Sequence, residues 1–323
     1  VCYTFFMKLI ISNSSRGAYR GVMEQLKTRL GESNIVIAPD RFTASVERGV
    51  ISTLKLESSF GIDVMSFTRL ANKLVGKDIK KCLTPEGSVM LIGKVIAERY
   101  KEFKYYGRVA MSEGFASELY AALTAIRNSG ISTEMLSESM QKMSPALKAK
   151  TQDIITIYDG YLEALSGRHS DSSTRLYALA EYISTHPECV ATTHFYCTDI
   201  YEFSAPELEI IARLSKHAMS LTIGLVSGYD NPNRRIYPDR VINKLKSVCG
   251  DRVQTERYDE PLSPPIDAVS RQLFSYGVAD EPAENGGKIT LRAAKDRHDE
   301  CLALALDIVD KIQKGGRYKD VEV

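Results

Sequence analysis

Short apolar runs alternate with segments of helical spacing over the first 75 residues of the chain. An unbroken run of apolar residues indicates a buried strand, whereas apolar residues that recur every three or four positions indicate a helix with one buried face. The predicted strands are 9–11, 35–38 and 62–66, and the predicted helices are about 20–30, 42–56 and 67–75. Because strands and helices alternate in this way, we expect a parallel sheet with helices packed over it.

The pattern changes at Thr84 and Pro85, where a long helix is predicted to begin. Threonine is a favoured N-cap, and proline is favoured at the first helical position. From there to about residue 184 the apolar positions keep a period of 3.6, and no strand pattern occurs. The predicted helices are 84–100, 111–128, 145–166 and 173–185. We therefore expect an all-helical segment inserted into the α/β frame.

The α/β pattern returns near residue 193. Strands are predicted at 193–198, 219–226 and 288–291, helices at 205–217, 238–248 and 297–314, a linker at 285–287, and the start of a strand at 318–323. We expect the chain to be part of something longer. The expected domains are a first lobe in two parts, 1–83 and 189–284, a helical lobe, 84–188, and the truncated start of a second lobe, 285–323.

The length, net charge and cysteine content of the chain exclude several classes of protein and of binding site. With 323 residues, 44% of them hydrophobic, the chain is long enough for two or three lobes. Its net charge of +1 means that any nucleic-acid contact must be a local groove and not a general basic coat. Six scattered cysteines without a C-x-x-C pair argue against zinc, an iron–sulfur cluster or a disulfide framework here, and favour a reducing cytoplasm. No apolar run reaches the length of a membrane span.

A candidate phosphate-binding loop follows the first predicted strand, where backbone N–H groups and a helix N-terminus can hold phosphates. The pattern G-x-x-x-x-G-K-[ST] matches only at Gly17, because Ala18 replaces the lysine and Tyr19 replaces the hydroxyl that binds Mg²⁺. The segment consists of Ser12, Asn13, Ser14, Ser15, Arg16, Gly17, Ala18 and Tyr19. It is either a degenerate nucleotide loop or an ordinary turn between a strand and a helix.

Nucleotide hydrolysis also needs an acidic pair at the end of a later strand, to hold the metal and position water. The candidate region is Thr198, Asp199 and Glu202, in which only Asp199 stands at the strand end. The alternative is that both carboxylates are surface residues, which are favoured near helix N-termini in any case. In an active enzyme, Arg16 would have to replace the missing lysine.

Two polar segments, 39–43 and 66–69, follow the second and third predicted strands. The carboxyl ends of parallel strands share one edge of the sheet, where open α/β sheets bind ligands. Arginines and hydroxyls bind phosphate and rings stack on bases, so these side chains suit single-stranded nucleic acid. The candidates are Arg41, Thr43, Phe67 and Arg69. The alternative is that Phe67 is a core residue and that the arginines face water.

A basic run with interleaved tyrosines occupies 94–108. It includes Lys94, Arg99, Lys101, Lys104 and Arg108. Such a run either follows a nucleic-acid backbone or forms the solvated face of a helix.

Together these segments resemble the N-terminal helicase-like region of the AddB/RexB subunits of bacterial ATP-dependent helicase–nucleases, which are related to superfamily 1 helicases. The matching segments, in order, are Ser12 to Tyr19, Pro39-Asp40, Ser66 to Ala71, Leu83-Thr84, Ala178 to Ile183, Phe195 to Glu207 and Arg317 to Val321. The resemblance implies a P-loop NTPase (RecA-like) parallel sheet with an inserted all-helical subdomain and the start of a second α/β lobe.

The resemblance also implies a function in processing double-strand DNA breaks for recombinational repair. It implies binding to single- and double-stranded DNA ends, with an AddA-type helicase–nuclease subunit as the partner in a heterodimer. The implied DNA contacts in this chain are Arg41, Thr43, Phe67, Arg69 and Phe203. An iron–sulfur cluster is implied only for a nuclease domain that this chain does not include.

Because the lysine and the hydroxyl of the phosphate loop are replaced, we expect a helicase-like module without ATPase activity. We expect no catalytic residue, metal or bound ATP and Mg²⁺ in this chain, no contact with a membrane, and a cytoplasmic location. Two alternatives stay open. One alternative is that the chain is an active P-loop ATPase, and the other is that it is a structural scaffold for the partner helicase subunit.

Overall fold

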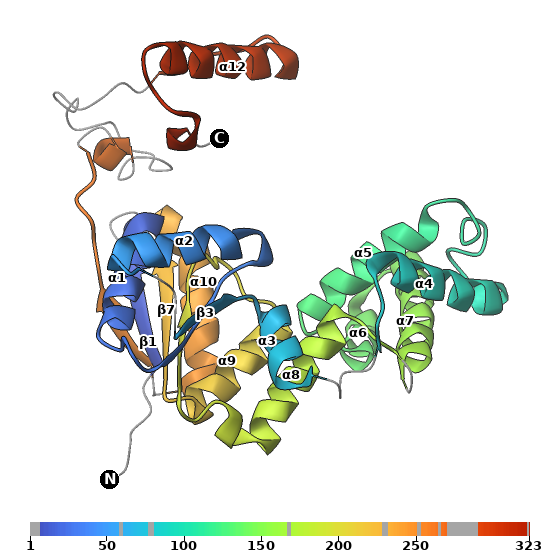
Figure 1. Ribbon diagram of the computed structural model, residues 1–323. Helices are drawn as coiled ribbons and strands as arrows, with labels where there is room; N and C mark the ends of the chain where they lie inside the picture. Colours follow the sequence, from blue (N-terminus) through green and yellow to red (C-terminus); the bar gives the residue numbers. More distant parts are fainter. Residues whose placement is uncertain are drawn as a thin grey trace. The chain divides into compact units, whose positions relative to one another are not determined.

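The computed structural model describes residues 7–57, 61–76, 81–166, 169–227, 232–250, 253–263, 266–269, 290–321 and 323. The chain divides into two compact units, 1–261 and 262–323. A six-stranded, all-parallel sheet forms the centre of the first unit (Figure 1). Its order is β3 (Ile62–Met65), β2 (Ser33–Ile37), β6 (Thr193–Cys197), β7 (Ser220–Val226), β1 (Met7–Ser12) and β8 (Val253–Arg257).

Helices cover both faces of this sheet, which explains why its central strands are continuous apolar runs. Leu9 and Ile37 pack on one face, whereas their neighbours Ile10 and Val36 pack on the other. The first face is covered by α3 (Phe67–Leu74), α8 (Ser172–Thr185), α9 (Ala205–His217) and α10 (Pro232–Cys249), and the second by α1 (Ser15–Lys27) and α2 (Thr43–Leu54). This α/β architecture is the predicted one and is consistent with a RecA-like fold.

Four helices from the middle of the chain surround a separate hydrophobic core that includes Ile92, Leu123 and Ile157. They are α4 (Pro85–Arg99), α5 (Phe115–Asn128), α6 (Thr133–Ser139) and α7 (Pro145–Leu165). We call them the helical cluster. As predicted, Thr84 caps α4, and its side chain accepts a hydrogen bond from the Gly87 N–H at 3.2 Å.

A buried polar network joins the helical cluster to α8. Asp171, the N-cap of α8, accepts hydrogen bonds from the Thr174 N–H at 2.8 Å and the Tyr161 hydroxyl at 3.1 Å. It also forms a buried ion pair with Arg127 of α5. Although the predicted helical lobe ends at residue 188, α8 packs on the sheet core, for example through Leu179. The domain boundaries proposed from the sequence stay predictions.

The remaining short elements lie between these helices and strands. Strands β4 (Lys81–Cys82) and β5 (His169–Ser170) form a separate two-stranded sheet. The described residues of the first unit include the 3₁₀ turns η1 (Asp40–Phe42), η3 (Tyr100–Glu102), η4 (Met140–Lys142) and η5 (Pro187–Cys189).

The second unit contains the predicted helix as α12 (Arg297–Gln313), which begins at the N-cap Asp296. The strand expected at 318–323 is wrong, because η7 (Tyr318–Asp320) is a 3₁₀ turn. Of the strand expected at 288–291, the first two residues lie outside the described part of the chain, and Thr290 and Leu291 are not in a strand. The predicted linker at 285–287 also lies outside the described residues.

Candidate functional site

The candidate phosphate loop is a tight turn. Only Asn13 and Ser14 separate β1 from α1. The side chain of Ser14 caps the helix by accepting a hydrogen bond from the Gly17 N–H at 3.0 Å. The helix therefore begins at Ser15, and the expected start near residue 20 is wrong. Gly17, Ala18 and Tyr19 are helical residues, and no extended loop surrounds a space for phosphate.

The inside of this turn is filled by the chain itself. A Cβ atom at Gly17 would lie 2.2 Å from the Ser12 Oγ and 3.2 Å from the Tyr258 carbonyl oxygen. The Ser12 side chain is fully buried, and its hydroxyl accepts a hydrogen bond from the Ser14 N–H at 3.3 Å. Gly17 thus allows close packing of α1, strand β1 and the residues that follow β8.

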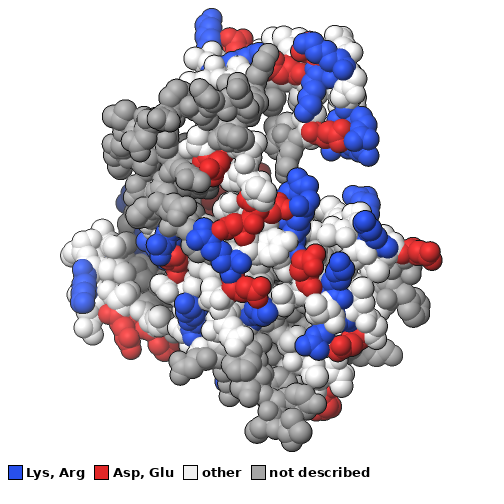
Figure 2. Space-filling view, turned by 90° about the vertical axis from the view of Figure 1, so that its left-hand side faces the viewer, with Lys and Arg blue, Asp and Glu red and all other residues white. Residues whose placement is uncertain are grey.

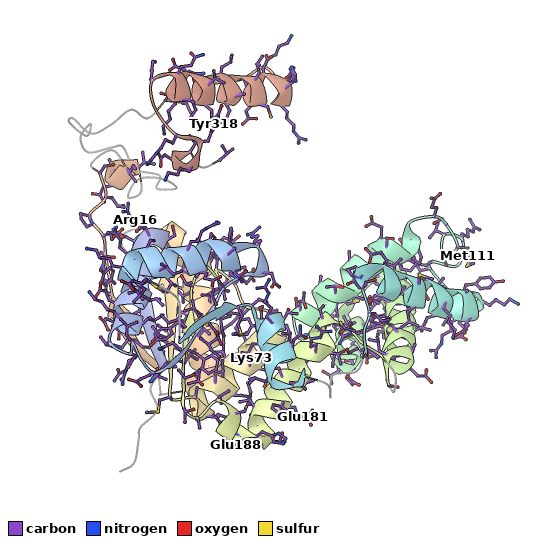
Figure 3. All side chains as sticks on the ribbon, viewed as in Figure 1. Arg16, Lys73, Met111, Glu181, Glu188 and Tyr318 are labelled. Atoms are coloured by element: carbon purple, nitrogen blue, oxygen red, sulfur yellow. The ribbon has the colours of Figure 1, made fainter. Side chains whose placement is uncertain are left out.

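Residues 258–260, which we call the acidic segment, bring two carboxylates to the turn. The Asn13 N–H donates to the Asp259 carboxylate at 3.1 Å, and the Asn13 side-chain amide donates to the Glu260 carbonyl oxygen at 3.1 Å. Arg20 forms an ion pair with Glu260, and Arg16 lies 3.7 Å from the same carboxylate. Figure 3 labels Arg16 at the start of α1. The acidic segment therefore occupies donors and cations that a phosphate would need.

Tyr19 stands where a phosphate loop has its metal-binding hydroxyl, but its side chain packs between helices. Its hydroxyl would lie 2.7 Å from a Cβ atom at Gly49 of α2. Burial raises the pKa of this hydroxyl, and the nearby charge of Asp199 raises it further. Tyr19 therefore serves the packing of α1 on α2.

Asp199 follows β6 in an unusual backbone conformation, with φ at +57°. Residues other than glycine seldom adopt this left-handed region, although aspartate does so more often than most. Burial raises the pKa of the Asp199 carboxyl, while a hydrogen bond from the Thr198 hydroxyl at 3.1 Å opposes the shift. Such backbone outliers gather at functional sites.

Glu202 is the second carboxylate of the candidate region, three positions after Asp199. It is exposed and lines a different feature, a cavity of about 610 Å³ that Phe203 and Lys244 also line. Within the described residues, no group of three or more His, Cys, Asp or Glu side chains is placed to hold a metal ion.

The predicted rim at the carboxyl ends of β2 and β3 does bring several candidates together around Asp40. The Thr43 hydroxyl donates to the Asp40 carbonyl oxygen at 3.1 Å, and Arg69 lies 3.6 Å from the Asp40 carboxylate. Arg41 is exposed, and its guanidinium lies 4.6 Å from the centre of the Phe42 ring. We call Arg41, Thr43 and Arg69 the rim.

The aromatic candidates are placed differently. Phe67 and Phe203 are both 4% exposed and belong to the hydrophobic core under the sheet. Thr43 is buried as well, so Arg41 and Arg69 are the exposed members of the predicted set. In this conformation the rim offers cations for phosphate, and the half-buried Phe42 is the ring next to them.

Residues 9–245 of the chain match the family described as ADDB, N-terminal. The chain belongs to this family. It is 24% identical to the B subunit of the ATP-dependent helicase/deoxyribonuclease of Bacillus velezensis, 26% to that of Listeria monocytogenes serotype 4a and 24% to that of Bacillus subtilis. Each alignment covers 98% of this chain but only 29–30% of the relative. The chain thus spans less than a third of the length of these relatives.

Sequence reasoning missed the acidic segment of this AddB-type region. Strand β8, which positions it, reads Val-Gln-Thr-Glu-Arg and has no apolar run to reveal it. The pair Asp259-Glu260 before Pro261 was the available signal. On the face shown in Figure 2, acidic and basic side chains are interspersed and do not separate by sign. No helix of the described residues is long and apolar enough to cross a membrane.

Proposed function

We propose that this chain is the helicase-like, ATPase-inactive, DNA-binding region of the AddB-type member of a helicase–nuclease complex. In this proposal it works with an AddA-type helicase–nuclease subunit on broken DNA ends, for recombinational repair in the cytoplasm. Membership of the AddB N-terminal family and the names of the relatives support the assignment to such a complex. The five described cysteines, Cys82, Cys189, Cys197, Cys249 and Cys301, are free thiols, as suits a reducing compartment.

The observation that carries the inactive assignment is the filled turn between β1 and α1. A nucleotide phosphate would have to displace Asp259 and Glu260 and would meet no lysine in their place. Arg16, the proposed substitute in an active enzyme, lies beside Glu260 and is already neutralised in part. Mg²⁺ would also lack its hydroxyl ligand, because Tyr19 packs against α2.

The test is a phosphate-release assay with ATP, with and without single-stranded DNA, on the 323-residue chain. We expect no turnover above background under either condition. Equilibrium dialysis with labelled ATP measures binding separately from hydrolysis. DNA-stimulated turnover that Arg16→Ala abolishes would show that the active-ATPase alternative is correct.

DNA binding is proposed for the exposed arginines of the rim. Arg69 is 59% exposed on its side chain, and Asp40 competes with DNA phosphate for its guanidinium. We therefore expect Arg69→Ala and Arg41→Ala to weaken binding of single-stranded DNA. We expect Asp40→Asn to strengthen it, because this change frees Arg69.

Lys73→Gln is the matched control for the rim, because Lys73 lies on the same helix as Arg69, α3 (Figure 3), and is paired with Asp63. Affinity measured against salt concentration adds a second readout, since each phosphate contact on a single strand contributes about 0.7 to the log–log slope. Unchanged affinity in both arginine variants would contradict the rim assignment. A wild-type chain without salt-dependent DNA affinity would favour the scaffold alternative.

Phe67 and Phe203 stay predicted DNA contacts on the strength of the resemblance. Both side chains are core residues in this structure, and removal of a buried phenylalanine costs about 3–5 kcal/mol of stability. Alanine variants at these positions would therefore destabilise the fold, and a loss of DNA binding in them could not be assigned to a lost DNA contact.

A further inference from the structure

The helical cluster contains a pocket of about 580 Å³ that the proposed function does not use. It lies among the residues after α4, the end of α6 and the first half of α7. Its lining includes Lys104, Lys148, Gln141, Gln152, Met140 and Pro145, and we call it the lysine pocket. Its volume lies within the range of ligand pockets in proteins, and its lining contains no carboxylate.

One wall of the lysine pocket is held in place by a buried carboxylate. Asp153 of α7 accepts hydrogen bonds from the N–H groups of Lys104 at 3.0 Å, Tyr105 at 2.8 Å and Tyr106 at 2.8 Å. These three bonds fix the backbone that carries Lys104. Tyr105 is exposed and packs edge-on against Tyr106.

The basic run at 94–108 divides into paired and unpaired cations. Lys94 lies 3.8 Å from Glu98, and Arg99 lies 2.9 Å from Glu163. By contrast, neither Lys104 nor Lys148 has a carboxylate partner among the residues that the structure describes. The segment 140–152 adds two more lysines, Lys142 and Lys150, and contains no Asp or Glu. Of these lysines, Lys104 and Lys148 line the pocket, whereas Lys142 and Lys150 do not.

We propose that the lysine pocket binds one unpaired nucleotide of single-stranded DNA. The ammonium groups of Lys104 and Lys148 would bind backbone phosphate, which is the largest source of affinity for nucleic acid. The amides of Gln141 and Gln152 can both donate to and accept from base edges, and Met140 with Pro145 provides an apolar surface for the base. A base enters such a pocket only when it is unpaired and unstacked.

The proposal rests on DNA binding by this chain, but it does not depend on the rim. The closing experiment measures binding of a fluorescent oligothymidylate to the 323-residue chain over a range of salt concentrations. The test variant is Lys104→Gln/Lys148→Gln. The matched control is Lys94→Gln/Lys314→Gln, which removes two lysines that already have partners, Glu98 at 3.8 Å and Asp310 at 2.6 Å.

We expect the pocket variant to bind at least about tenfold more weakly at low salt and its log–log slope to fall by about 1.4, for two lost phosphate contacts. The control variant should retain wild-type affinity. A blunt duplex of the same length should compete poorly with the oligothymidylate. The proposal for the lysine pocket would be wrong if the pocket and control variants lost affinity for the oligothymidylate equally, or if the duplex competed as well as the single strand.

The rim variant Arg41→Ala/Arg69→Ala separates this inference from the proposed function. If the wild-type chain binds DNA and only the rim variant is weakened, the lysine pocket is refuted and the rim stands. If the wild-type chain binds no DNA, both fail together. If the pocket variant alone is weakened, the lysine pocket is supported and the rim assignment fails.

Discussion

Asp171 connects three elements through one side chain. It caps α8, accepts the Tyr161 hydroxyl and is paired with Arg127, and both charged groups are buried. Removal of one partner from a buried ion pair leaves the other charge uncompensated, which costs about 3–5 kcal/mol. Without the Asp171 carboxylate, the buried charge of Arg127 would lose its partner, and the folded state would be less stable.

We expect Asp171→Asn to lower the free energy of unfolding of the first unit by about 3–5 kcal/mol. Asparagine can still cap α8, so the loss reports mainly on the charge. Urea unfolding followed by circular dichroism measures it. Asp63→Asn is the control, since it breaks an exposed pair with Lys73 and should cost no more than about 1 kcal/mol. Equal effects of the two variants would contradict a buried role for Asp171.

Asp199 combines a left-handed backbone conformation with a half-buried carboxyl. Burial raises the pKa of this carboxyl, so the folded state holds its proton more tightly than the unfolded chain. The ionised carboxylate thus opposes folding above the ordinary carboxyl pKa of about 3.9, and this penalty fades as the pH falls toward that value.

We expect Asp199→Asn to be more stable than the wild type at pH 7, with a difference that shrinks near pH 4. Asparagine tolerates the left-handed backbone, whereas Asp199→Val should lose about 1–2 kcal/mol, because its branched side chain does not. Thermal unfolding of the three proteins at both pH values measures this. A stability difference between wild type and asparagine variant that is the same at pH 4 and pH 7 would show that the Asp199 pKa is not raised.

Among the elements, the acidic segment decides the chemistry of the candidate phosphate site. Asp259→Asn/Glu260→Gln should remove the negative charge beside the Asn13 N–H, Arg16 and Arg20 while keeping the shape of the side chains. We therefore expect this variant to gain measurable affinity for inorganic pyrophosphate, which isothermal titration calorimetry detects. It should still not hydrolyse ATP, because the lysine remains absent.

The control for the acidic segment is Glu256→Gln on strand β8, which removes the 2.9 Å ion pair of Glu256 with Lys8 of β1. This change removes one negative charge close to the acidic segment in sequence, but Glu256 makes no contact with the turn between β1 and α1 that the structure records. We expect the control to resemble the wild type in pyrophosphate binding. If the double variant also binds no pyrophosphate, the carboxylates are not what excludes anions from the turn.

The elements that the sequence predicted best are those whose signals are local. Thr84 and Pro85 mark the start of α4, and the apolar runs of β1 and β2 mark buried strands. Strand β8 was missed because it lies at the sheet edge, where four of its five side chains are exposed. The start of α1 was missed because it depends on the side-chain geometry of Ser14, which a hydrophobic pattern does not contain.

The sequence predicted which edge of the sheet carries the candidate segments, but not which of their side chains are buried or what those side chains contact. The order of parallel strands places 39–43 and 66–69 at one edge, as expected from the pattern. Burial of Phe67 and Phe203 depends on long-range packing, and contact of Asp259 and Glu260 with Asn13 joins positions about 246 residues apart. Spacing along a single sequence carries no record of such contacts.

At the scale of the whole molecule, the two units differ in how they are stabilised. In α9, residues such as Ile210 and Leu214 are buried in the sheet core. In α12 no residue is buried, and Leu302 and Leu306 are exposed. Most helical stability in proteins comes from tertiary packing, and α12 buries no side chain among the described residues.

We therefore expect hydrogen exchange in the 323-residue chain to separate the units. The amides of α12 should exchange close to the rate of an unstructured peptide, while those of α9 should exchange only on global unfolding of the first unit. Mass spectrometry of peptides from both helices in one sample provides the internal control. Protection of α12 equal to that of α9 would mean that its apolar residues are covered in solution. In that case the exposed side chains of Leu302 and Leu306 would mark an interface that forms when the chain is free to associate.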